Sequence, residues 1–209
     1  MKHEWRKAEK GLYIPGTKPA FVDVPAFSYF TIAGQGNPNE RAFAERVEAL
    51  YAAAYTVRMA HKSGFAPPDY FEYTVYPLEG VWDISDQAKL DYNGVIDKDT
   101  LVYTLMIRQP AFVTDAFAEE ALDRALAKKG NALIGQIQFQ VIEDGPSVQM
   151  LHKGSFDDEA VSFEVMETFC KDNNLTRASK QHREIYLSDF RKTEPENLKT
   201  TLRFQVLAG

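Results

Sequence analysis

The sequence predicts an α+β fold made of two similar strand-helix-strand-strand modules, with antiparallel sheets around a central ligand cleft. Hydrophobic residues recur at intervals of two in some segments and of three to four in others, which is typical of strands and of amphipathic helices. The predicted elements also follow the same order in both halves of the chain. We therefore expect one domain of two pseudo-repeats, at about residues 4–129 and 130–209.

The first half is predicted to contain two helices between strands. Two helix starts are predicted: Asn37 as an N-cap followed by Pro38 at the first helical position, and Thr114 as the N-cap of a second helix. Apolar residues then recur every three or four positions, toward Gly64 in one helix and Gly130 in the other; in the first helix they are Phe43, Val47, Leu50, Ala54 and Val57. The segment Gly34-Gln35-Gly36 is interpreted as a turn. The expected elements are a strand region at 21–34 interrupted by Pro25, a helix ending near Gly64, strands at 71–76 and 101–108 joined by residues 77–100, and a helix at 114–130.

The second half repeats this order. Ser155 begins a segment that is typical of a capping box. Phe163, Met166 and Cys170 then share one face of a helix that ends near Asn173, so we expect the lone cysteine to be a buried small hydrophobic side chain. The other expected elements are strands at 138–142, 147–152, 182–190 and 198–207.

Composition excludes several classes of protein. The net charge is −6, and no run of Lys or Arg exceeds two residues, so a nucleic-acid partner is not expected. No segment approaches the roughly 20 apolar residues of a membrane span, and we expect no membrane contact and a cytoplasmic location. Aromatic residues make up 12% of the chain, and such side chains line small-molecule pockets as readily as they fill cores.

The segment 182–190 places a carboxylate within a predicted sheet. Because side chains alternate along a strand, His182, Glu184 and Tyr186 share one face, while Ile185 and Leu187 lie on the other. A glutamate that leaves water needs a cation, a hydrogen-bond donor or a ligand, or it loses its charge. Glu184 is therefore the leading candidate for a functional residue. The alternative is a structural ion pair across the sheet, for example with Arg203.

Two motifs carry a resemblance to a known family. The run from Tyr73 to Trp82, which contains Tyr-Pro-Leu-Glu-Gly-Val-Trp, and the run His-Arg-Glu-Ile-Tyr-Leu at 182–187 resemble the GyrI-like small-molecule-binding proteins. The likeness covers nearly the whole chain and includes a later Lys-Thr-Thr-Leu strand at 199–202. That fold is the effector-binding domain of multidrug-responsive transcription regulators. The Trp82 motif is similar to that of a subfamily of free-standing two-module proteins, and no helix-turn-helix segment is expected.

The resemblance implies a central pocket for large, flat, aromatic or cationic molecules, with the key acid at Glu184 and Tyr186 beside it. Some members of this subfamily are similar to hydrolases that open the strained cyclopropane ring of DNA-alkylating natural products. In such a reaction, Glu184 could activate water while Tyr186 or His182 supplies a proton. The candidate residues are Glu184 and Tyr186 for catalysis, and Trp82, Glu79, Tyr76, Tyr103 and His182 for ligand binding.

Three functions remain open at this point. The chain could be a binding protein that sequesters small aromatic or cationic molecules, a detoxifying hydrolase, or an interaction module that inhibits a protein such as gyrase. No cofactor is expected. No metal is expected either, because His3, His61 and His152 show no metal-ligand spacing with one another or with Cys170. No feature of the sequence indicates an oligomeric state.

Overall fold

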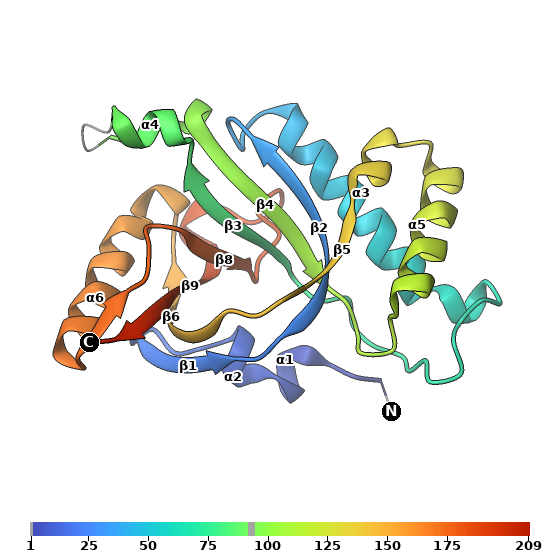
Figure 1. Cartoon of the computed structure of the whole chain (residues 1–209), viewed down its shortest axis with the longest axis horizontal. Coiled ribbons are helices and arrows are strands. Elements are labelled where there is room, and N and C mark those ends of the chain that lie inside the picture. Colours follow the sequence, from blue (N-terminus) through green and yellow to red (C-terminus); the bar gives the residue numbers. More distant parts are fainter. Residues whose placement is uncertain (1, 92–94) are drawn as a thin grey trace. The chain divides into compact units, whose positions relative to one another are not determined.

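The computed structural model describes residues 2–91 and 95–209, which form helices and antiparallel strands (Figure 1). The described chain divides into two compact units, each made of separate segments. Of the described residues, the first unit contains 2–4, 27–76, 82–91 and 95–142, and the second contains 5–26, 77–81 and 143–209. Residues 92–94 of the predicted connection 77–100 lie outside the described residues.

The first unit holds two long helices and antiparallel strands. Strand β2 (Phe27–Gln35) pairs with β4 (Leu101–Arg108) and with β5 (Gln138–Ile142). Helix α3 (Arg41–Arg58) packs against β2, β4 and helix α5 (Asp115–Lys129), and the two helices lie side by side in Figure 1. The unit also contains the short elements α4 (Asp86–Leu90), η1 (Ala60–Lys62), η2 (Lys98–Thr100) and η3 (Ala132–Gln136).

The second unit is built around strand β9 (Lys199–Ala208). This strand pairs with β6 (Gly145–Lys153), β7 (Leu175–Arg177) and β8 (His182–Tyr186), and β1 (Ala20–Val24) pairs with β6; all four pairings are antiparallel. Helix α6 (Glu159–Asp172) packs on β6 and β7. The unit also contains α1 (Trp5–Ala8), α2 (Lys10–Tyr13), η4 (Phe156–Asp158) and η5 (Pro195–Asn197).

The predicted fold class is confirmed. In the first half, β2, α3, β3 (Leu78–Ile84) and β4 follow in the predicted strand-helix-strand-strand order; the second half has β6, α6, β8 and β9 in the same order, with the additional short strand β7 between α6 and β8. Residues 78–81 of β3 belong to the second unit and residues 82–84 to the first. The compact units are therefore not continuous stretches of sequence, and the predicted repeat boundary between residues 129 and 130 stays a prediction.

Several predicted elements are confirmed closely. The α3 residues at the predicted apolar positions, Phe43, Val47, Leu50, Ala54 and Val57, are all buried. Helix α5 has Thr114 as its N-cap, whose hydroxyl accepts a hydrogen bond from the Phe117 backbone N–H at 3.3 Å. It ends at Gly130 in the left-handed conformation (φ 64°), which glycine adopts without steric cost. Cys170 is buried with Met166 in the core beside α6, as expected.

The predicted start of the first helix at Asn37 is wrong. Helix α3 begins at Arg41, with Glu40 as N-cap. The Asn37 side-chain oxygen instead accepts a hydrogen bond from the Asn39 backbone N–H at 3.1 Å, which closes a local turn. Asparagine favours such turns as strongly as helix caps, because its short side chain reaches the backbone two residues ahead.

The strand predicted at 71–76 is also wrong. Tyr73 forms an isolated bridge with His3, and the strand β3 begins at Leu78. Pro77 and Gly80 are residues typical of turns and fall in the predicted connection 77–100, but Gly80 is buried within β3. Gly34 likewise belongs to β2 and not to the predicted turn, because the Tyr103 ring on β4 covers it. Among the described residues, no helix is long and apolar enough to cross a membrane.

Candidate functional site

Strand β8 holds Glu184 in a buried position between polar and aromatic side chains. The residue is 9% exposed, and its Oε1 lies 3.1 Å from His182 Nε2. The Phe163 ring of α6 meets the His182 ring edge-on, with centroids 4.7 Å apart. Tyr186, at the end of β8, makes an edge-on contact with Phe156 at 5.9 Å. The predicted residues Glu184, His182 and Tyr186 are thus accompanied by aromatic rings from α6 and from the turn before it.

A second acid, Glu159, joins this group. It is the first residue of α6, is 6% exposed, and its Oε1 has no hydrogen-bond partner. One ligand atom from each of Glu159, His182 and Glu184 lies within 4.8 Å of the others. Burial raises the pKa of the Glu159 carboxyl well above its ordinary value, and the nearby charge of Glu184 raises it further. Glu159 therefore holds its proton at a pH where an exposed glutamate is ionised.

The three side chains are also of the kinds that bind divalent cations. His182 Nε2, however, already lies at hydrogen-bond distance from Glu184, and Glu159 hydrogen-bonds to Glu184 through its side chain. We therefore interpret the group as a hydrogen-bonded pair of acids with one histidine. We call Glu159, His182 and Glu184 the acid pair site.

Sequence reasoning did not identify Glu159. The segment from Ser155 to Asp158 was predicted to be a helix cap, and Ser155 Oγ indeed accepts a hydrogen bond from the Asp157 backbone N–H at 3.2 Å. That bond closes the short helix η4, so that α6 begins at Glu159. A glutamate in the first turn of a helix has a common structural explanation, because it interacts favourably with the helix dipole. No local pattern indicated that this one would meet Glu184.

The opposite face of β8 carries a second charged group, which the sequence had assigned to apolar packing. Arg183 donates hydrogen bonds to Glu79 Oε2 at 2.8 Å and to Asp144 Oδ1 at 2.6 Å. Arg203 pairs with Asp144 at 3.3 Å and donates to Gln149 at 2.9 Å. The alternative partner considered for Glu184, Arg203, is therefore occupied by other groups.

Glu79 is the negative partner in this network. It is 1% exposed, and burial raises the pKa of its carboxyl, an effect that the positive charge of Arg183 opposes. Its Oε2 pairs with Arg183, whereas its buried Oε1 accepts no hydrogen bond within the described part of the chain. A role of Glu79 in ligand binding stays a prediction.

The predicted aromatic residues of the first unit pack in two places. Trp82 and Tyr103 have ring centroids 4.9 Å apart, and both contact the Phe43 ring of α3, at 5.8 and 5.2 Å. Tyr76 lies elsewhere in the unit, with the Arg108 guanidinium 4.6 Å from its ring centroid. All four of these aromatic side chains are buried: Trp82, Tyr103, Phe43 and Tyr76. Their predicted ligand contacts stay a prediction.

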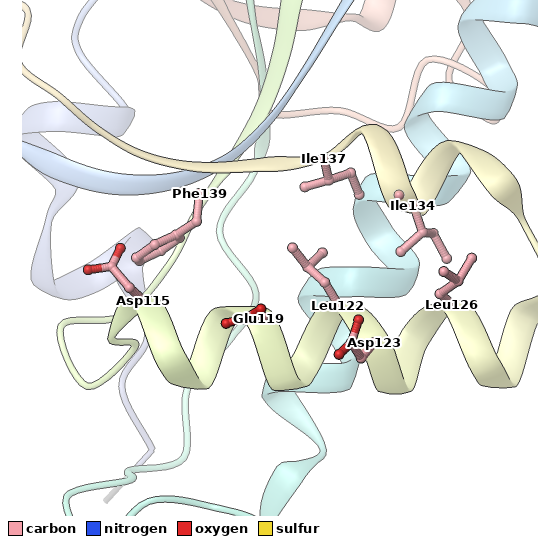
Figure 2. A pocket seen from close by; sticks show the side chains of 9 residues that line it. Asp115, Glu119, Leu122, Asp123, Leu126, Ile134, Ile137 and Phe139 are labelled. Atoms are coloured by element: carbon pink, nitrogen blue, oxygen red, sulfur yellow. The ribbon is translucent and has the colours of Figure 1, made fainter.

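A surface hollow of about 280 Å³ lies in the first unit between α5, η3 and β5 (Figure 2). Figure 2 shows acidic side chains along α5 and apolar side chains facing η3. None of the residues predicted for the site lines it. Its lining comprises Asp115, Glu119, Leu122, Asp123, Leu126, Ile134, Gly135, Ile137 and Phe139.

Comparison with known proteins agrees with the predicted resemblance. The family model of the GyrI-like small molecule binding domain matches residues 17–207. A hydrolase from Listeria innocua has a TM-score of 0.90 and 33% sequence identity, with 99% of this chain and 100% of that chain covered. A second L. innocua hydrolase structure has a TM-score of 0.89 and 32% identity, over 99% and 100% of the two chains.

An uncharacterized conserved protein from L. innocua is similar to the same extent, with a TM-score of 0.89, 34% identity and coverage of 99% and 100%. No curated protein sequence matches the chain significantly. Since the family model spans nearly the whole chain, the chain belongs to the GyrI-like small-molecule-binding family.

Proposed function

We propose that this protein binds an aromatic or cationic small molecule at Glu184 and hydrolyses a strained ring in it, such as the cyclopropane of a DNA-alkylating compound. The observation that carries the proposal is the acid pair site, a buried carboxylate beside a second acid and a histidine. A buried carboxylate near aromatic rings favours a delocalised cation, because charge pairing and ring contacts act together. Hydrolysis needs both a base and a proton donor, and the His182 ring lies within hydrogen-bond distance of Glu184.

The reaction can be assigned to residues of β8. Glu184 takes a proton from water as the water oxygen bonds to a ring carbon. The ring carbon–carbon bond breaks, and its electron pair moves to the neighbouring atom of the substrate, which receives a proton. His182 at 3.1 Å from Glu184 and Tyr186 at the end of the strand are the donors predicted from the sequence. Ring strain lowers the barrier, so the protein mainly positions the water and the ring.

Two observations support hydrolysis over simple sequestration. The two acids lie in different environments, because burial and the neighbouring charge of Glu184 raise the pKa of the Glu159 carboxyl. Such a difference suits one acid to act as a base and a neighbour to hold a proton. In addition, the two L. innocua proteins at 32% and 33% identity are hydrolases. By hydrolysing a reactive alkylating compound, the protein would act in detoxification.

The test follows ring opening of a cyclopropane-bearing alkylator by wild type and by Glu184→Gln. Loss of the base should lower kcat by roughly two to four orders of magnitude. Glu164→Gln is the matched control. It is the same substitution, and Glu164 is an exposed residue of α6, the helix that also carries Glu159. If wild type gives no rate above buffer, hydrolysis is dropped and the binding function remains. An unchanged kcat for Glu184→Gln would exclude Glu184 as the base.

Binding is tested separately with a planar cation such as ethidium. Glu184→Gln should weaken its affinity by about 2 kcal/mol, roughly 30-fold, if the carboxylate and the cation meet away from water. The Glu164→Gln control should bind as wild type does. The predicted ligand-binding role of Trp82 is tested in the ring-opening assay, where Trp82→Ala should lower kcat/KM. Equal affinities for wild type and Glu184→Gln would show that Glu184 is structural.

A further inference from the structure

We propose that Glu159 and Glu184 hold a single proton between them, so that Glu159 keeps the site at one negative charge near neutral pH, and that binding of a cation releases this proton. Glu159 acts through Glu184 and is therefore a positioning residue. The ligand-linked part rests on the proposed function. The shared proton itself does not, because it is a property of the free protein.

The geometry of the two acids is the first step. Both carboxyls are buried, at 6% and 9% exposure, and their nearest ligand atoms lie within 4.8 Å. Two ionised carboxylates at this separation and burial repel each other strongly, so one of them keeps a proton. A proton between them also allows a hydrogen bond, which joins Glu159 to Glu184.

The charged and titratable neighbours decide which acid keeps the proton. Glu159 faces Glu184 on β8 and Asp157 on η4, and both negative charges raise its pKa in addition to burial. Glu184 lies beside His182, which offers it a hydrogen bond at 3.1 Å. His152 on β6 also lies near the start of α6, but its ring nitrogens contact Ser162 Oγ and the Ser155 carbonyl oxygen. These contacts favour the proton on Glu159.

This arrangement links ligand charge to the proton. A cation that binds next to Glu184 stabilises a second negative charge at the pair, so the pKa of Glu159 falls on binding and its proton leaves. An uncharged ligand provides no such stabilisation. During hydrolysis, the proton that Glu184 takes from water replaces the one that Glu159 lost when the cation bound, so the pair again holds one proton at the end of the cycle.

The shared proton is tested without a ligand, by a carbon-13 NMR titration of the glutamate side-chain carboxyls in the full chain. In wild type, one glutamate carboxyl should remain protonated near neutral pH. This signal should be absent in Glu159→Gln. In Glu184→Gln, the Glu159 carboxyl should titrate at lower pH than in wild type, because the neighbouring negative charge has been removed. Glu164→Gln should leave the signal unchanged.

Two results would overturn the proposal, one from this titration and one from a metal analysis of the purified protein. One is a wild type in which every glutamate is ionised near neutral pH. The other is a stoichiometric divalent metal in the purified protein that is lost in both Glu159→Gln and Glu184→Gln, since the acids would then hold a cation. If Glu159→Gln does not fold, the shift in Glu184→Gln decides the question alone, because a structural role for Glu159 predicts no shift toward lower pH.

The linkage is tested by calorimetry with ethidium in two buffers of different ionisation enthalpy. Wild type should release about one proton per bound cation near neutral pH, and Glu159→Gln should release none. Binding by wild type without proton release would refute the linkage. If no cation binds at all, the proposed binding function fails, while the NMR titration still decides whether the proton is shared.

Discussion

The buried pair of Arg183 and Glu79 allows a quantitative prediction. Arg183→Met removes a guanidinium that lies 2.8 Å from Glu79 and 2.6 Å from Asp144. Asp144 keeps Arg203 at 3.3 Å, but Glu79, at 1% exposure, has no other ion pair among the described residues. Breaking a buried ion pair by removing one partner costs about 3 to 5 kcal/mol of unfolding free energy. We expect a loss of that size near neutral pH.

The pH dependence of this loss follows from the pKa of Glu79. Burial raises this pKa above 4.5, and Arg183 opposes the rise, so Arg183→Met should raise it further. Below the unfolded pKa, Glu79 is protonated in both states and the missing cation matters least. As the pH rises, Glu79 ionises in the unfolded chain but keeps its proton in the folded variant. The free energy of unfolding of the variant therefore falls until the pH passes the pKa of Glu79 in the folded state. The difference from wild type should be larger near pH 7 than near pH 5.

Urea unfolding of wild type and variants at both pH values is the assay. The double variant Glu79→Gln with Arg183→Met should regain much of the loss, because no uncompensated charge remains buried. Arg191→Met is the control, since the pair of Arg191 with Asp189 lies at the surface and should contribute less than about 1 kcal/mol. If the double variant is no more stable than Arg183→Met, the cost does not come from the charge of Glu79, and the reasoning is refuted.

The remaining predictions concern packing. Gly34→Ala should destabilise the fold by about 1 to 3 kcal/mol, because a Cβ there would lie 2.2 Å from the Tyr103 ring; a normal melting temperature would contradict this. Trp82→Ala should cost about 3 to 5 kcal/mol in urea unfolding, because it removes a buried ring stacked on Phe43, and an unchanged stability would refute that packing role. Burial raises the pKa of the Cys170 thiol, so iodoacetamide should label it slowly in the folded chain and quickly in urea; rapid labelling of the folded chain would argue against its burial.

The sequence predicted best those elements whose signals are local. The apolar positions of α3 and the strand Leu101–Arg108 follow from periodicity within one segment. Thr114 and Gly130 bound α5 through contacts with residues only a few positions away. These features depend little on the rest of the fold, so they could be predicted without it.

The errors occurred where distant residues decide the local structure. Gly34 and Gly80 resemble turn residues, but both lie in strands, and at Gly34 the Tyr103 ring covers the backbone in place of a side chain. Residues 71–76 have the composition of a strand, but Tyr73 bridges only His3 within the described part of the chain. Glu159 could not be identified as a neighbour of Glu184, because the contact joins the start of α6 to β8.

The two faces of β8 show how buried charges of different roles can be told apart. On one face, the Arg183 guanidinium lies between Glu79 and Asp144, so each of these acids has an opposite charge beside it. On the other face, Glu184 has an acid and a histidine as its neighbours. Placing an acid beside an acid costs folding free energy that a purely structural site would avoid. The acid pair is therefore better explained by a function that uses a proton or binds a cation, which is why we assign the chemistry to this face of the strand.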